Sequence, residues 1–92
     1  MSKYLIELPH GSEKVECLRS ASILLNSGNH FLRNADWGCL DGEHKAWFFM
    51  DAESKEEVLQ VVPPAYRKDA QIHKLNKFRL EDVEELLRYH QK

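Results

Sequence analysis

The pattern of hydrophobic and polar residues predicts a chain of alternating strands and helices. Side chains alternate between two faces along a strand, whereas they repeat about every 3.6 residues around a helix. The predicted elements are a strand over 3–8, a helix over 12–25, a hairpin over 30–50, a helix over 54–62, a strand over 71–78 and a helix over 80–90. The hairpin contains both tryptophans and joins two strands, so the order of elements is β-α-β-β-α-β with a terminal helix.

The hairpin is predicted from Asp41-Gly42, which stands between two apolar-rich runs. This pair favours a two-residue type I′ turn, because both central residues of that turn need a positive φ. The turn would set Trp37 opposite Ala46 and Cys39 opposite His44. Residues in such a non-hydrogen-bonded pair have Cβ atoms about 4.5–5.5 Å apart. We therefore expect Cys39 and His44 to lie side by side.

Capping signals define the helices. Ser12 is the expected N-cap of the first helix, and the segment from Ser54 to Glu57 has the S-x-x-E pattern of a capping box. Pro63 should end the second helix. The expected buried face of the first helix consists of Val15, Leu18, Ala21 and Leu25.

This order of elements is the ferredoxin-like α+β pattern, for which we expect a sheet with strand order 4-1-3-2 and both helices on one face. The 92 residues form one domain, with 79–92 appended as the terminal helix. The segment 46–50 is apolar at consecutive positions, so both of its faces favour burial. Because the helices cover one face, we expect a homodimer through the other face of the sheet. The alternative cover is the terminal helix, acting as a lid within one chain.

A wider set of residues resembles a known superfamily. The pattern consists of Trp37, Asp41-Gly42, Lys45-Ala46, Phe48, Ala52, Ser54, Glu56-Glu57-Val58, Ala70 and Ile72. It is similar to small uncharacterised proteins of the dimeric α+β-barrel superfamily, which are related to a nickel-binding branch. The resemblance implies a homodimer that binds a small molecule or a metal ion, such as nickel or zinc, in a pocket on the sheet. It assigns no ligand residue.

Cys39 and His44 are the candidate metal ligands, because a thiol and an imidazole at this spacing suit one soft metal ion or a thiol beside its base. The alternative is a small cysteine packed beside a histidine near a turn. A structural zinc site needs four protein ligands, and the hairpin supplies two. The two cysteines, Cys17 and Cys39, have no CxxC spacing. Free thiols in a reducing cytoplasm are therefore expected, with a disulfide as the alternative.

The candidate catalytic residues are Glu7, His10 and His30. We take the first and third strands as parallel, which predicts a polar rim that collects His10, His30, Arg33, Asp51, Tyr66 and Arg67. That rim would suit an anion or a small acid with a histidine as general base, or would be only a polar edge. Glu7 interrupts an apolar strand. It is either a buried acid–base group or the ion-pair partner of Lys45.

Composition narrows the possible partners. The net charge of −2 argues against nucleic acid, although Lys45 to Met50 loosely matches the third-strand signature of RNA-recognition motifs. No apolar run approaches the roughly 20 residues that span a bilayer, and no leader pattern is present, so we expect a cytoplasmic protein without a membrane partner. RNA binding and a purely structural or regulatory dimer are the alternatives to ligand binding.

Overall fold

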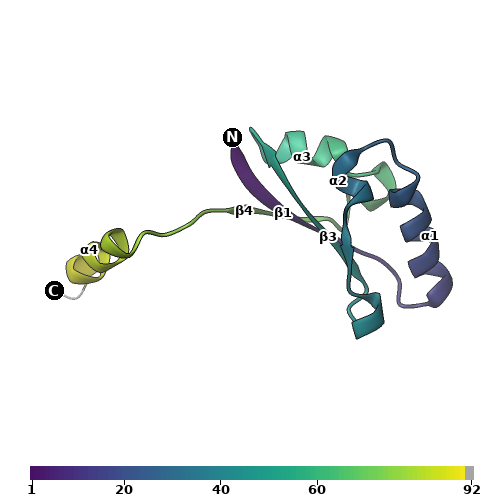
Figure 1. Cartoon of the computed structure of the whole chain (residues 1–92), viewed down its shortest axis with the longest axis horizontal. Coiled ribbons are helices and arrows are strands. Elements are labelled where there is room, and N and C mark those ends of the chain that lie inside the picture. The colour runs from purple at the N-terminus through teal and green to yellow at the C-terminus, as the bar shows by residue number, and fades with distance from the viewer. Residues whose placement is uncertain (91–92) are drawn as a thin grey trace.

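The computed structural model describes residues 1–90, which form an antiparallel sheet with helices on one face and one further helix beyond its edge (Figure 1). The strands are β1 (Ser2–Pro9), β2 (Asp36–Trp37), β3 (Lys45–Ala52) and β4 (Gln71–Leu75). The α-helices are α1 (Lys14–Leu25), α2 (His30–Arg33), α3 (Lys55–Val61) and α4 (Leu80–His90). Short 3-10 turns span Cys39–Asp41 and Pro64–Tyr66. The predicted α+β class is confirmed, and the sheet is compatible with a ferredoxin-like fold.

The strand order is β2-β3-β1-β4, which reads 4-1-3-2 when counted from the β4 edge. Every pairing is antiparallel, and β1 pairs with β3 from Ser2↔Ala52 to Pro9↔Lys45. The expectation that the first and third strands run parallel is therefore wrong. The crossover through α1 and α2 makes β2 parallel to β1, and the following hairpin reverses the chain. The end of β1 consequently meets the start of β3.

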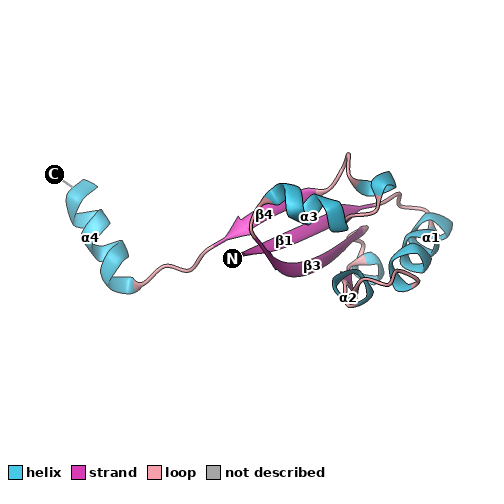
Figure 2. Cartoon of the chain, turned by 90° about the horizontal axis from the view of Figure 1, so that it is seen from above, coloured by secondary structure: helices cyan, strands magenta, loops and turns pink. Residues whose placement is uncertain are grey.

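The core lies between one face of the sheet and the helices. Alternate residues of β1 and β3 point into it, in agreement with the period of a strand. The buried apolar residues are Tyr4, Ile6, Leu8, Leu24, Leu32, Ala46, Phe48, Met50, Ala52, Val58 and Val62. We call the other face of the sheet, which carries Leu5, Glu7, Trp47 and Phe49, the open face. Figure 1 shows the three helices α1, α2 and α3 together on one side of the sheet, and in Figure 2 the sheet is seen from that side.

The hairpin differs from its prediction in two places. The segment His30–Arg33 is helical rather than a strand, because the Asn29 side chain caps it by accepting the N–H groups of Phe31 and Leu32 at 2.9 and 3.2 Å. The type I′ turn is replaced by the 3-10 turn Cys39–Asp41, after which Gly42 alone has a positive φ, 82°. The predicted pairing of Trp37 with Ala46 is nevertheless confirmed.

The first helix begins later and turns a different face inward than predicted. Its N-cap is Glu13 rather than Ser12, and no side chain caps it. Ser20 and Leu24 are its buried residues, and the Ser20 hydroxyl is 2.8 Å from the Tyr66 hydroxyl. Most of the predicted apolar face, namely Val15, Leu18 and Leu25, is exposed. The side of α1 that packs is therefore the one with Ser20 and Leu24, and the apolar stripe was misleading.

The second predicted helix is confirmed at both ends. Ser54 Oγ accepts the Glu57 N–H at 3.2 Å, and the Glu57 carboxylate accepts the Glu53 N–H at 2.9 Å. The helix ends at Val61, shortly before Pro63. By contrast, β4 ends at Leu75, three residues earlier than the predicted end at 78.

The terminal helix α4 has the predicted bounds 80–90, and none of its residues is buried. Figures 1 and 2 show it standing clear of the sheet at the end of an extended segment, so it is not a lid on its own chain. Residues 91–92 of the predicted appendage 79–92 lie outside the described residues. Within residues 1–90, no helix combines the length and the apolar character needed to cross a membrane.

Candidate metal centre

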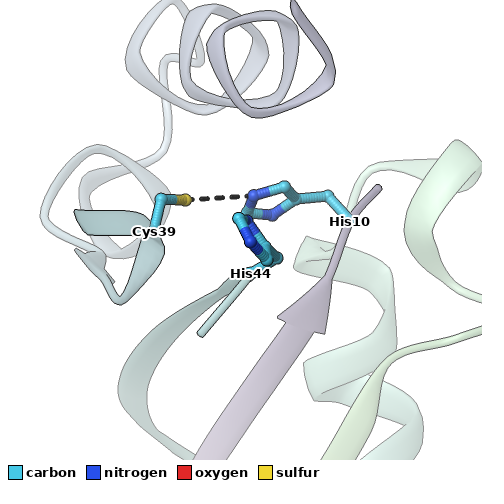
Figure 3. Close-up of side chains that lie close together, drawn as sticks. All are labelled: His10, Cys39 and His44. Carbon is cyan, nitrogen blue, oxygen red and sulfur yellow. Dashed lines mark hydrogen bonds between the residues drawn. The ribbon is translucent and has the colours of Figure 1, made fainter. Parts of the chain in front are cut away.

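The antiparallel pairing of β1 and β3 brings two histidines together at one end of the sheet. His10 follows the last residue of β1, and His44 precedes the first residue of β3. The His10 N–H donates to the His44 carbonyl at 3.0 Å, which extends the strand pairing by one step. The loop between β2 and β3 then folds back as the 3-10 turn that carries Cys39. Figure 3 shows the Cys39 sulfur facing the two imidazole rings.

The three side chains form a compact donor cluster. The potential ligand atoms of His10, Cys39 and His44 all lie within 4.8 Å of one another. His10 Nε2 is 3.1 Å from Cys39 Sγ, and the two imidazole rings meet edge to face with their centroids 6.0 Å apart. The expected proximity of Cys39 and His44 is present, although a longer loop than the predicted turn produces it. His10 was not predicted to join them.

Two polar atoms of this cluster are buried without a partner. The Nδ1 atoms of His10 and His44 are inaccessible to solvent and accept or donate no hydrogen bond within the described part of the chain. Buried polar atoms are almost always hydrogen-bonded, so each exception calls for an explanation, such as an ion. An imidazole nitrogen beside a thiol is a typical ligand of a transition metal.

Cys17 adds a second thiol next to the cluster. It lies in the first turns of α1, and its thiol donates to Cys39 Sγ at a sulfur–sulfur distance of 2.7 Å. Both cysteines are free and half-buried. The end of β1, helix α1 and the loop before β3 therefore bring two sulfurs and two imidazoles into one region, and Cys17 contacts the three-residue cluster through Cys39 alone.

Burial controls the protonation of the cluster. It raises the pKa of the Cys39 thiol to about 11, and the hydrogen bond from Cys17 acts in the same direction. Burial also lowers the pKa of His10, and the neighbouring His44 lowers it further. His10 is therefore held in the neutral form that ligates metals. The Cys39 thiol must release its proton to become a ligand.

The other predicted site residues lie elsewhere. Glu7 is on the open face, where it contacts Lys45 at 3.9 Å and His73 at 3.8 Å and accepts the indole N–H of Trp47 at 3.2 Å. The expected ion pair with Lys45 is thus present. His30 is exposed on α2, 3.3 Å from the Asn34 side chain.

The predicted polar rim is not assembled. Asp51 pairs with Lys3 at the opposite end of β1 from His10, since β1 and β3 are antiparallel. His30 and Arg33 line a separate pocket of about 310 Å³. Tyr66 bonds to Ser20 on α1, and the Arg67 guanidinium donates to the Val62 carbonyl at 2.8 Å.

The open face also bears on the RNA-recognition alternative. Lys45, Trp47 and Phe49 occupy alternate positions of β3 and share this face, as the third-strand signature requires. The aromatic residue of the first strand, Tyr4, is 3% exposed and lies in the core. It is therefore not available for stacking on a base.

Comparisons of the chain with protein-family models, with curated proteins and with solved structures found no match. The resemblance to dimeric barrels and to a nickel-binding branch consequently rests on the sequence pattern alone.

Proposed function

We propose that the protein binds a divalent transition-metal ion between His10, Cys39 and His44, and that zinc is the ion that these donors fit best. The observation that carries the proposal is the convergence of two imidazoles and a half-buried thiol, whose potential ligand atoms all lie within 4.8 Å of one another. Thiolate and imidazole ligands favour zinc, whereas imidazole also suits nickel. Nickel is therefore the second ion to test.

The role best supported for the ion is to tie together segments that are distant in the chain. His10 and Cys39 are 29 residues apart, and each follows the end of a different strand. Because the ligands converge only in the folded chain, the free energy of metal binding adds to the stability of the fold. Thiol ligands suit a reducing compartment, which agrees with the expected cytoplasmic location.

Metal analysis of the purified full-length protein tests this proposal. After incubation with zinc and removal of free ion, we expect about one zinc per chain in the unaltered protein. Cys39→Ser and His44→Ala should each lose most of the bound ion. The matched control is His30→Ala, which removes an exposed histidine outside the cluster and should retain full loading.

Circular dichroism identifies variants that fail to fold, and only folded variants are compared. A protein that retains neither zinc nor nickel would contradict the proposal. Full loading of both cluster variants would contradict it equally, because the ion would then be bound elsewhere.

A second proposal concerns the open face, which we propose is covered by a second copy of the chain. The apolar side chains Leu5, Trp47, Phe49 and Leu75 support it, since they alternate with charged groups that are already paired. Single-stranded RNA is the alternative occupant. The burial of Tyr4 and the carboxylate of Glu7 at the centre of the face favour a protein partner.

A further inference from the structure

We propose that Cys17 and Cys39 act together as a dithiol: both sulfurs bind the metal ion, and a soluble low-molecular-weight disulfide converts them into a Cys17–Cys39 disulfide that releases the ion. Cys17 is thus the redox partner of Cys39, and it would join the three clustered groups as a fourth ligand once the ion separates the two sulfurs. The part of the inference that concerns metal binding by both sulfurs rests on the proposed metal site. The formation of the disulfide is independent of that site.

The positions of the sulfur atoms support this pairing. They are 2.7 Å apart, and a disulfide bond is about 2.05 Å long, so closure needs a shift of well under one ångström. The two thiols come from α1 and from the loop after β2, which are 22 residues apart. No CxxC motif signals the pair, and only the fold brings the thiols together.

A pocket gives a small oxidant access to the thiols. It has a volume of about 290 Å³, and its lining includes both cysteines together with Lys14, Leu18 and Leu40. The positive charge of Lys14 favours an anionic molecule, and the two leucines tolerate an apolar part of that molecule. Oxidised glutathione, an anionic disulfide, is the probe that fits this description.

The reaction is a thiol–disulfide exchange, in which oxidised glutathione accepts the two electrons that the protein thiols lose. One cysteine thiolate attacks a sulfur of oxidised glutathione, which forms a mixed disulfide and expels the first glutathione thiolate. The second cysteine sulfur then attacks the mixed disulfide and expels the second glutathione. Two protein thiols are oxidised, one glutathione disulfide is reduced, and the two thiol protons go to the departing thiolates. From the metal-bound form, the same exchange releases the ion as the free dication.

Loss of the thiolates should abolish metal binding, because a disulfide sulfur is no longer an anionic donor and leaves two imidazoles as ligands. Conversely, the bound ion should protect the thiols. With zinc at about 100 times its dissociation constant, roughly one chain in a hundred is free of metal, so oxidation should slow by about 100-fold.

The experiment treats metal-free and zinc-loaded full-length protein with oxidised glutathione and follows intact mass and zinc content over time. We expect the metal-free protein to lose the mass of two hydrogens, and peptide mapping should locate the bond between Cys17 and Cys39. The zinc-loaded protein should react far more slowly and release one ion per disulfide formed.

Two variants test whether Cys17 is the thiol that closes the disulfide with Cys39. Cys17→Ser should retain a stable glutathione adduct on Cys39, because no second thiol resolves it. The double variant with Cys17→Ser and Ser22→Cys keeps two thiols per chain but moves one to an exposed position, and it should form no internal disulfide. Both variants should also bind zinc less tightly than the unaltered chain.

Stable adducts on unaltered metal-free protein, without closure to the internal disulfide, would overturn the inference. Oxidation at the same rate with and without bound zinc would also overturn it, because the sulfurs would then not be ligands. If zinc does not bind at all while the disulfide forms, the proposed metal function fails and the redox pairing of the thiols stands. The two failures are therefore distinguishable.

Discussion

Phe48 and Phe49 are neighbours on β3 and lie in opposite surroundings. Phe48 is 4% exposed beneath the helices, whereas Phe49 is 50% exposed on the open face, with the Lys3 ammonium 4.7 Å from its ring centroid. The core face is mainly apolar, while the open face alternates apolar side chains with ion pairs such as Glu7 with Lys45. The comparison shows that a strand with apolar residues at consecutive positions is buried by its own chain on one side only.

The largest expected effect comes from the buried side of this comparison. Phe48→Ala should lower the free energy of unfolding by about 3–5 kcal/mol, because it removes a large side chain from a packed core. Phe49→Ala is the matched control, and in the monomer it should cost far less. Denaturant-induced unfolding measures both values at a protein concentration low enough to keep the chain monomeric. Equal losses would mean that the open face is as well packed as the core.

The second prediction concerns a partner on the open face. If a second copy covers it, Phe49→Ala should weaken the dimer by about 2 kcal/mol, as for an aromatic residue central to an interface. This corresponds to a rise in the dimer dissociation constant of roughly 30-fold. Sedimentation equilibrium over a range of concentrations gives this constant. His30→Ala, on the helical side of the sheet, should leave it unchanged.

A monomer at all concentrations would refute the proposed dimer. If that monomer bound an unstructured oligonucleotide, and Phe49→Ala reduced the binding, base stacking on the open face would take its place.

Local signals in the sequence predicted the elements well. The capping box at Ser54 and the bounds of α4 follow from neighbouring residues, and the pairing of Trp37 with Ala46 follows from the position of Asp41-Gly42. The helix over 30–33 was missed because the decisive group is the Asn29 side chain, whose position in a stop signal suggested the end of α1. The helix α1 in fact ends with Asn26 as its C-cap, and the Asn29 oxygen caps the next helix instead.

The candidate site could be predicted only in part, because two of its residues are brought in by contacts between segments that are distant in the sequence. Cys39 and His44 are close in sequence, and the short loop between β2 and β3 brings them together, although through a 3-10 turn and not through strand pairing. His10 joins them because β1 and β3 are antiparallel, and Cys17 joins because of how α1 lies on the sheet. Strand direction follows from the crossover topology, and applying that rule correctly would have placed His10 next to His44. Nothing local to Cys17 indicates its contact with Cys39.

The third prediction concerns the charges of the open face. Glu7→Gln keeps the size of the side chain but removes the charge that faces Lys45 and His73. The free energy of unfolding should fall by about 0.2–1 kcal/mol, because partly exposed ion pairs contribute little. Thermal and denaturant unfolding at low and high salt measure the loss, which should shrink as salt screens the pair. A loss as large as that of Phe48→Ala would indicate that Glu7 is buried in the assembled protein.

The smallest expected effect is that of removing α4. A chain that ends at Arg79 loses a helix with no buried residue, so the free energy of unfolding of the remaining domain should change by less than about 0.5 kcal/mol. The same truncation distinguishes two ways of covering the open face. If sheets pack directly against each other, the dimer dissociation constant should be unaffected. If α4 of one copy lies across the open face of the other, the truncated chain should be monomeric. The full-length protein, diluted below its dissociation constant, should then leave the Phe49 side chain as exposed to solvent as the truncated chain does.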